Sequence, residues 1–122
     1  MKELFLVGSG GAIGAILRWL VSTWVISLQN TAFPWPTLTV NALGCFAIGI
    51  AFVLIDKNAT PGLALFIIVG VFGAFTTFST FGLDAFDLLI NGKILTSLIY
   101  IISCNVGGLA LVYLGVKAAQ TI

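Results

Sequence analysis

Four long apolar segments constrain this sequence more than any other feature. They cover about residues 4–28, 36–55, 62–88 and 94–116, and the charged residues inside them are Arg18 and, near the end of the third, Asp84 and Asp87. Each segment reaches the roughly 20 residues that a helix needs to cross a bilayer. Only 7% of the residues are charged, against about 25% in soluble domains. The sequence therefore predicts an all-α integral membrane protein with four transmembrane helices.

Short polar segments join the four predicted helices, and we expect a single membrane domain over residues 1–122. Pro61 suits the first turn of a helix, and Trp35 suits the aromatic belt at a membrane interface. The first segment is long and continues through Arg18, so we do not expect a cleaved signal peptide. Four short helices leave few side chains to line a cavity, which suggests that function requires more than one copy.

The distribution of positive charge across the predicted membrane is weakly biased. With four spans, Lys2, Lys57 and Lys117 lie on one side, and Lys93 lies on the other. Because an excess of Lys and Arg on the cytoplasmic side orients membrane proteins, so small a bias leaves insertion in either orientation open.

Several classes of chemistry lack the residues they need. The chain has no histidine, and Cys45 and Cys104 lie in different spans without a CxxC motif, so packing is the simpler interpretation. The stretch "GSGGAIG" lacks the spacing of a dinucleotide loop, and Gly10 and Gly14 fit a face for close helix packing. No basic patch indicates nucleic-acid binding. We therefore predict that the protein is not an enzyme and does not bind nucleic acid.

Polar side chains inside the predicted spans are the candidates for function. Arg18 is costly in lipid and should face a wet cavity or a partner, although it could also extend toward the interface. Asn41 could either hydrogen-bond to another helix or line a pathway for a solute. Tyr100 and Asn105 in the fourth span present the same two alternatives.

The stretch "FGAFTTFSTFG", residues 72–82, places four hydroxyls among phenylalanines near the middle of the third span. Glycines and β-branched threonines there could interrupt the helix at about residues 74–78 and free backbone carbonyls, which are tolerated at that depth when buried or lining a cavity. Phe78 and Phe81 are three residues apart, and their positive ring edges could face a small anion. The alternative is an unbroken helix whose hydroxyls bond to their own carbonyls.

Three motifs in order, "GGAIGAILRW", "TLTVNALGCFAIG" and "GVFGAFTTFSTFG", closely resemble the Fluc (CrcB) family of fluoride channels. The resemblance covers nearly the whole chain. It implies a fluoride-selective channel in the bacterial plasma (inner) membrane that lowers cytoplasmic fluoride by passive export. It also implies an antiparallel, dual-topology homodimer with two pores, a broken third helix and a central structural sodium ion (Na+).

The resemblance also implies roles for particular residues. Those that match the family's fluoride pathway are Asn41, Phe78, Phe81, Ser79, Thr80, Tyr100 and Arg18. Gly73 and Thr76 match the positions whose backbone carbonyls hold sodium. One departure concerns the helical turns after Tyr100, where the family commonly has serines but this chain has Cys104 and Gly108. Ser103 and Asn105 are adjacent, and we expect them on other faces of the helix.

Two other classes of protein are alternatives to a channel. A small four-span proton-coupled multidrug transporter needs a carboxylate within the membrane, whereas Glu3, Asp56, Asp84 and Asp87 lie at predicted span ends. A helper subunit without transport activity would not need a polar cluster in mid-span.

Overall fold

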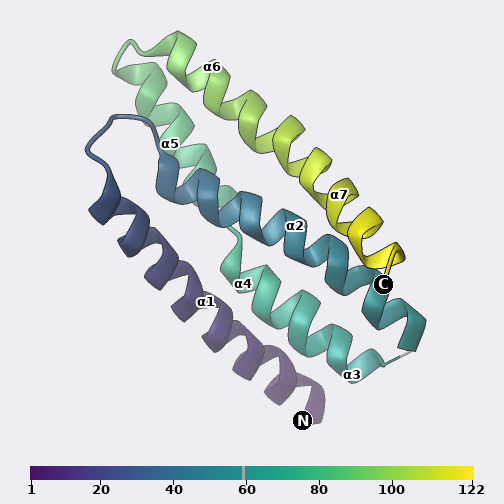
Figure 1. Cartoon of the computed structure of the whole chain (residues 1–122). Helices are drawn as coiled ribbons and strands as arrows, with labels where there is room; N and C mark the ends of the chain where they lie inside the picture. The colour runs from purple at the N-terminus through teal and green to yellow at the C-terminus, as the bar shows by residue number, and fades with distance from the viewer. Residues whose placement is uncertain (59) are drawn as a thin grey trace.

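The structure is a computed structural model that describes residues 1–58 and 60–122, and in this part of the chain all regular elements are helical. Four of the helical segments are long and apolar enough to cross a membrane, as judged from length and composition. They lie side by side as rods joined by short connections (Figure 1). The predicted all-α architecture with four candidate spans is therefore confirmed.

The first two rods are continuous helices, and the third and fourth are composite. Helix α1 is Lys2–Leu28 and α2 is Trp35–Asn58. The third rod consists of α3 (Pro61–Ala64), the π-helix η1 (Leu65–Phe72), α4 (Gly73–Phe75) and α5 (Phe78–Ile90). The fourth consists of α6 (Ile94–Ile102), the π-helix η2 (Ser103–Gly107) and α7 (Gly108–Gln120).

Glycines bring the backbones of neighbouring rods into contact. A Cβ atom on Gly10 would overlap the carbonyl oxygen of Phe66 in η1, and one on Gly14 would overlap that of Val71. This confirms the predicted packing face on α1. Gly115 in α7 lies equally close to the backbone of α2. Such small residues allow close packing where lipid provides no hydrophobic drive between helices.

Large apolar side chains cover the outside of the bundle instead of filling its interior. Trp19, Trp24 and Leu95 are 66%, 61% and 73% exposed. The main cluster of buried side chains lies between α5 and α6 and comprises Phe81, Ala85, Leu88 and Tyr100. An apolar exterior around a small core is the arrangement that a bilayer favours.

A tight turn connects α5 to α6 and orients the two helices against each other. Gly92 has a φ of 74°, a conformation that side chains rarely adopt and glycine adopts freely. The Lys93 amide donates to the Leu88 carbonyl at 2.9 Å, and Asn91 Nδ2 donates to the Asp87 carbonyl at 2.8 Å. The chain thus reverses within a few residues and places α6 beside α5 (Figure 1).

Candidate functional site

The third rod is interrupted at two adjacent threonines. Thr76 (φ −78°, ψ 158°) and Thr77 (φ −148°, ψ 116°) are extended, so α4 ends before them and α5 begins after them. The Thr77 hydroxyl accepts from the Thr80 amide at 3.2 Å, and it therefore caps α5. Although the backbone of Thr76 is extended, its hydroxyl donates to the Phe72 carbonyl at 2.8 Å. A threonine inside a helix makes the same bond to the carbonyl four residues earlier.

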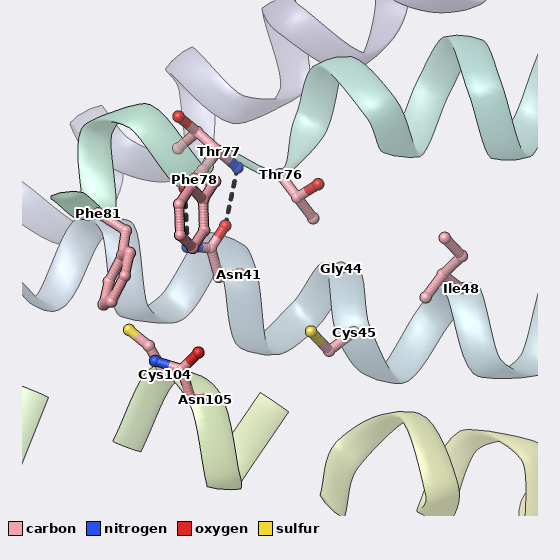
Figure 2. A pocket seen from close by; sticks show the side chains of 10 residues that line it. All are labelled: Asn41, Gly44, Cys45, Ile48, Thr76, Thr77, Phe78, Phe81, Cys104 and Asn105. Carbon is pink, nitrogen blue, oxygen red and sulfur yellow. Dashed lines mark hydrogen bonds between the residues drawn. The ribbon is translucent and has the colours of Figure 1, made fainter. Parts of the chain in front are cut away.

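Asn41 on α2 holds the interruption in place with both ends of its side-chain amide. The Thr77 amide donates to Asn41 Oδ1 at 2.9 Å, and Asn41 Nδ2 donates to the Thr77 carbonyl at 3.1 Å. Figure 2 shows both bonds between α2 and the extended segment. One side chain thus pairs with both backbone groups of a single residue, Thr77, as a neighbouring strand would. The amide nitrogen carries two N–H groups, so one of them can still donate into the adjacent cavity.

The interruption also redirects two backbone N–H groups that a continuous helix would use. In such a helix the Thr77 amide would donate to the Gly73 carbonyl, and the Thr80 amide to the Thr76 carbonyl. Here the Thr77 amide donates to Asn41, and the Thr80 amide donates to the Thr77 hydroxyl. The carbonyls of Gly73 and Thr76 therefore lose their regular helical donors.

A cavity of about 290 Å³ lies beside the break. Ten residues from the second, third and fourth rods line it: Asn41, Gly44, Cys45, Ile48, Thr76, Thr77, Phe78, Phe81, Cys104 and Asn105 (Figure 2). The Phe78 and Phe81 rings are 5.3 Å apart between centroids and tilted by 44°. Phe81 is 8% exposed, whereas Phe78 is 80% exposed. The two predicted rings are therefore neighbours, but this chain alone covers only one of them.

Two further cavities continue from the break toward the connection between α1 and α2. The nearer one, about 270 Å³, is lined by Arg18, Thr37, Thr77 and Thr80 among others. Thr77 also lines the cavity beside the break, so this residue borders both spaces. The outer one, about 540 Å³, shares Thr37 and Thr80 with the Arg18 cavity. Polar groups thus follow one another from the end of the bundle to its middle.

Asp84 lies at the centre of a small polar cluster beside these cavities. Its Oδ2 accepts from the Thr37 hydroxyl at 2.6 Å and from the Tyr100 hydroxyl at 3.1 Å. The sequence analysis predicts Asp84 at a span end and no role for Thr37. The spacing could have revealed both, because Thr37 precedes Asn41 by four residues and Asp84 follows Thr80 by four. Residues four apart share one face of a helix.

The structure gathers most of the candidate residues but not all of them. Asn41, Phe78 and Phe81 line the cavity beside the break, and Arg18 and Thr80 line the adjoining one. Tyr100 is fully buried, with its ring 5.4 Å from that of Phe81. Ser79 lines none of these three cavities.

The fourth rod departs from one expectation. Asn105 lines the same cavity as Cys104 (Figure 2), although adjacent residues were expected on different faces of an α-helix. Both residues lie in the π-helix η2, whose wider turns change the direction in which side chains point. Asn105 Nδ2 donates to the Ile101 carbonyl at 2.8 Å.

An all-helical protein with four candidate spans and polar cavities between them falls in the class of multi-pass membrane proteins. The chain belongs to the CrcB family, because residues 5–116 match the family described as "CrcB-like protein, Camphor Resistance (CrcB)". Proteins named "Fluoride-specific ion channel FluC" are similar to it over most of its length. One from Rhizobium meliloti is 45% identical and the match covers 84% of each chain.

Two further relatives that bear the same name match over essentially their full length. One from Rhizobium etli is 43% identical, covering 100% of this chain and 99% of the relative. One from Agrobacterium fabrum is 40% identical, with the same coverage. The chain is thus a multi-pass bacterial membrane protein of a channel family and not an enzyme.

Proposed function

We propose that this protein is a passive, fluoride-selective channel that lowers cytoplasmic fluoride. The observation that carries the proposal is the full-length similarity to proteins named fluoride-specific ion channels, together with the cavity that Asn41, Phe78 and Phe81 line. A proton-coupled multidrug transporter is not favoured by this similarity.

The donors around the cavity suit a small anion that must shed water. Fluoride accepts hydrogen bonds strongly, and a bond to a charged group contributes roughly 1.5–3 kcal/mol. The second N–H group of Asn41 can donate such a bond in this cavity, and the hydroxyl of Thr80 can donate one in the adjoining cavity. The positive edges of the Phe78 and Phe81 rings add weaker attraction. Arg18, one cavity further out, provides the positive charge that draws anions toward this series of cavities.

An antiparallel homodimer with two pathways accounts for the surfaces that one copy leaves open. Phe78 is 80% exposed beside the cavity, and an added Cβ on Gly73 would come no closer than 3.8 Å to its nearest neighbour, the Ile68 carbonyl oxygen. Both residues flank the break in the third rod. A second, inverted copy placed against this surface would cover Phe78 and bring the two breaks together. The weak charge bias is compatible with such dual topology.

Sodium fits the carbonyls that the break sets apart. The regular helical donors for the Gly73 and Thr76 carbonyls are bound elsewhere, and backbone oxygens are ligands that hard cations prefer. Two copies would offer four such oxygens. Bound there, sodium would supply positive charge to carbonyls that the second copy would bury, and it would stabilise the dimer without itself being transported.

Reconstitution tests the proposed function directly. The purified protein in liposomes should release fluoride, measured with an ion electrode, at a rate that needs no proton gradient. Chloride should pass poorly under the same conditions. Fluoride release that requires a pH gradient, or chloride release at a comparable rate, would refute passive selective conduction.

The dimer and its ion need a measurement other than flux. Single-molecule photobleaching in liposomes should show two copies per particle. Exchange of sodium for a large organic cation should lower the temperature at which detergent-solubilised dimers dissociate. Bulky replacement of Gly73 should lower it further, whereas Thr76→Ser should be mild because only the backbone of Thr76 would bind. If the dissociation temperature did not change without sodium, the proposal that sodium stabilises the dimer would be wrong.

A further inference from the structure

Gly44 on α2 lies directly against side chains of the interruption in the third rod. A Cβ atom on Gly44 would overlap Cγ2 of Thr76 and would lie 3.3 Å from Cδ1 of the Phe75 ring. Gly10 and Gly49, by contrast, would first meet backbone atoms of a neighbouring rod. The absence of a side chain at buried Gly44 thus leaves the space that the Thr76 methyl group occupies.

This contact holds the second branch of the Thr76 side chain. The first branch, the hydroxyl, donates to the Phe72 carbonyl at 2.8 Å. A β-branched side chain has few rotamers about its Cα–Cβ bond. With the hydroxyl held by its own rod and the methyl group held by α2, the position of Thr76 relative to α2 is fixed.

The same helix also holds the peptide unit that follows Thr76. The Thr76 carbonyl and the Thr77 N–H group belong to one planar peptide unit, and this N–H donates to Asn41 Oδ1 at 2.9 Å. Gly44 follows Asn41 by three residues and therefore lies on the same face of α2. Figure 2 shows Asn41 and Gly44 on α2, with Thr77 and Thr76 opposite them. Helix α2 thus meets this peptide unit at two points.

We propose that Gly44 is a positioning residue, which sets the place of the Thr76–Thr77 peptide unit by admitting the Thr76 methyl group. A side chain at residue 44 pushes Thr76 away from α2 and weakens the bond between the Thr77 amide and Asn41. The Asn41 amide then loses its fixed orientation beside the cavity that Asn41 and Gly44 both line. The consequence for conduction rests on the function proposed above, whereas the consequence for the Thr77 amide does not.

Hydrogen exchange of the Thr77 amide, measured by NMR on the purified protein in lipid nanodiscs, tests the positioning without any flux. In Gly44→Ala this amide should exchange at least about tenfold faster, because overpacking raises the population of locally open forms. Adding Thr76→Ser should restore slow exchange, since serine keeps the hydroxyl and lacks Cγ2. Adding Thr76→Val should not restore it, since valine keeps a methyl group there and lacks the hydroxyl.

Gly49→Ala is the matched control on the same helix. Its Cβ would overlap the Val112 carbonyl oxygen in α7, so the variant is overpacked away from the break. It should unfold at a lower temperature while the Thr77 amide exchanges at the wild-type rate. Thr76→Ser should not restore its stability, because the Gly49 contact does not involve Thr76.

The fluoride current through single channels in planar bilayers tests the link to conduction. Loss of stability alone lowers the number of channels, whereas a displaced pathway lowers the current through each one. The current should fall about tenfold in Gly44→Ala, as expected when a hydrogen bond to the anion is lost. Thr76→Ser should restore it, and Gly49→Ala should keep the wild-type current.

The outcomes separate this inference from the proposed function. Wild-type exchange of the Thr77 amide in Gly44→Ala overturns the positioning role, and equal recovery with serine and valine overturns the methyl contact. Fast exchange with a normal current overturns the link to the pathway. If Gly44→Ala yields no folded protein, recovery of folded protein by Thr76→Ser but not Thr76→Val supports the contact, and recovery by neither overturns it. A wild-type protein that never conducts fluoride but shows this exchange pattern supports the role of Gly44 and refutes the channel.

Discussion

The two halves of the third span meet their neighbours in different ways. The half before the break, residues 61–75, packs along α1 through backbone contacts at Gly10, Gly14 and Gly70. The half after it, α5, packs along α6 through rings and polar bonds. Ser97 donates to the Ala85 carbonyl at 2.9 Å, and Tyr100 donates to Asp84. Close apolar contact thus gives way to directional bonding at Thr76 and Thr77.

The difference shows where a membrane protein can tolerate polar groups. Glycine contacts bring the backbones of α1 and the first half together along one face. The second half meets its neighbours through side-chain bonds, and cavities lie beside it. Asn41 bonds to the backbone of Thr77, where the two halves join. Four substitutions would test this contrast.

Asn41→Asp should have the largest effect. The aspartate can accept from the Thr77 amide but cannot donate to its carbonyl, and its negative charge repels an anion. We expect fluoride efflux to fall more than about 100-fold, equivalent to about 2.7 kcal/mol. Gln120→Glu, which makes the same amide-to-carboxylate change at the exposed end of α7 and outside the three cavities, is the control. Efflux within about twofold of wild type would mean that the amide does not serve conduction.

Gly14→Ala should chiefly damage the first half. The added Cβ would lie 2.9 Å from the carbonyl carbon of Val71 and 3.0 Å from the Phe75 nitrogen, and backbone cannot yield as a side chain can. Overpacking of this kind costs roughly 1–3 kcal/mol, so thermal unfolding in detergent should occur at a clearly lower temperature. Gly11→Ala, which meets nothing within 4 Å, should not show this loss. Equal stability of the two variants would argue against backbone packing.

Phe81→Ile should impair conduction more than folding. Isoleucine keeps much of the bulk but removes the ring edge that lies near Phe78 and Tyr100. We expect about a tenfold fall in fluoride efflux, or about 1.4 kcal/mol, from a protein that remains monodisperse. Phe86→Ile on the 59% exposed outer side of α5 should conduct normally. If Phe81→Ile released fluoride at the wild-type rate, the Phe81 ring would contribute to packing and not to conduction.

Ser97→Ala should have the smallest effect. It removes a buried bond to the Ala85 carbonyl, which contributes about 1 kcal/mol, and it lies outside the three cavities. Unfolding temperature should fall slightly while fluoride efflux stays unchanged. Ser9→Ala, whose hydroxyl bonds within its own exposed helix, should change neither quantity. A large loss of efflux in Ser97→Ala would show that α6 positions the pathway more tightly than inferred.

The sequence predicted what depends on local composition. Long apolar segments with few charges predicted four helices, and clustered threonines with nearby glycines indicated a possible interruption of the third. The Asn41 pairing could not be predicted, because it joins positions 36 residues apart and depends on the register between helices. For the same reason the sequence predicts only an end-of-span charge at Asp84, although its carboxylate bonds to Thr37 and Tyr100 from two other rods. The dimer and the sodium ion stay predictions.

The amide tie at Asn41 also bears on the order in which the protein is made. The second span leaves the ribosome before the third, so the Asn41 side chain is already in the bilayer when Thr76 and Thr77 arrive. Peptide groups without partners cost several kcal/mol each in hydrocarbon. The interrupted segment therefore finds its hydrogen-bonding partner, Asn41, already present when it enters the bilayer. The order of the spans in the chain thus favours correct formation of the break. A circular permutant that delivers the second span last would have to insert the break without that template.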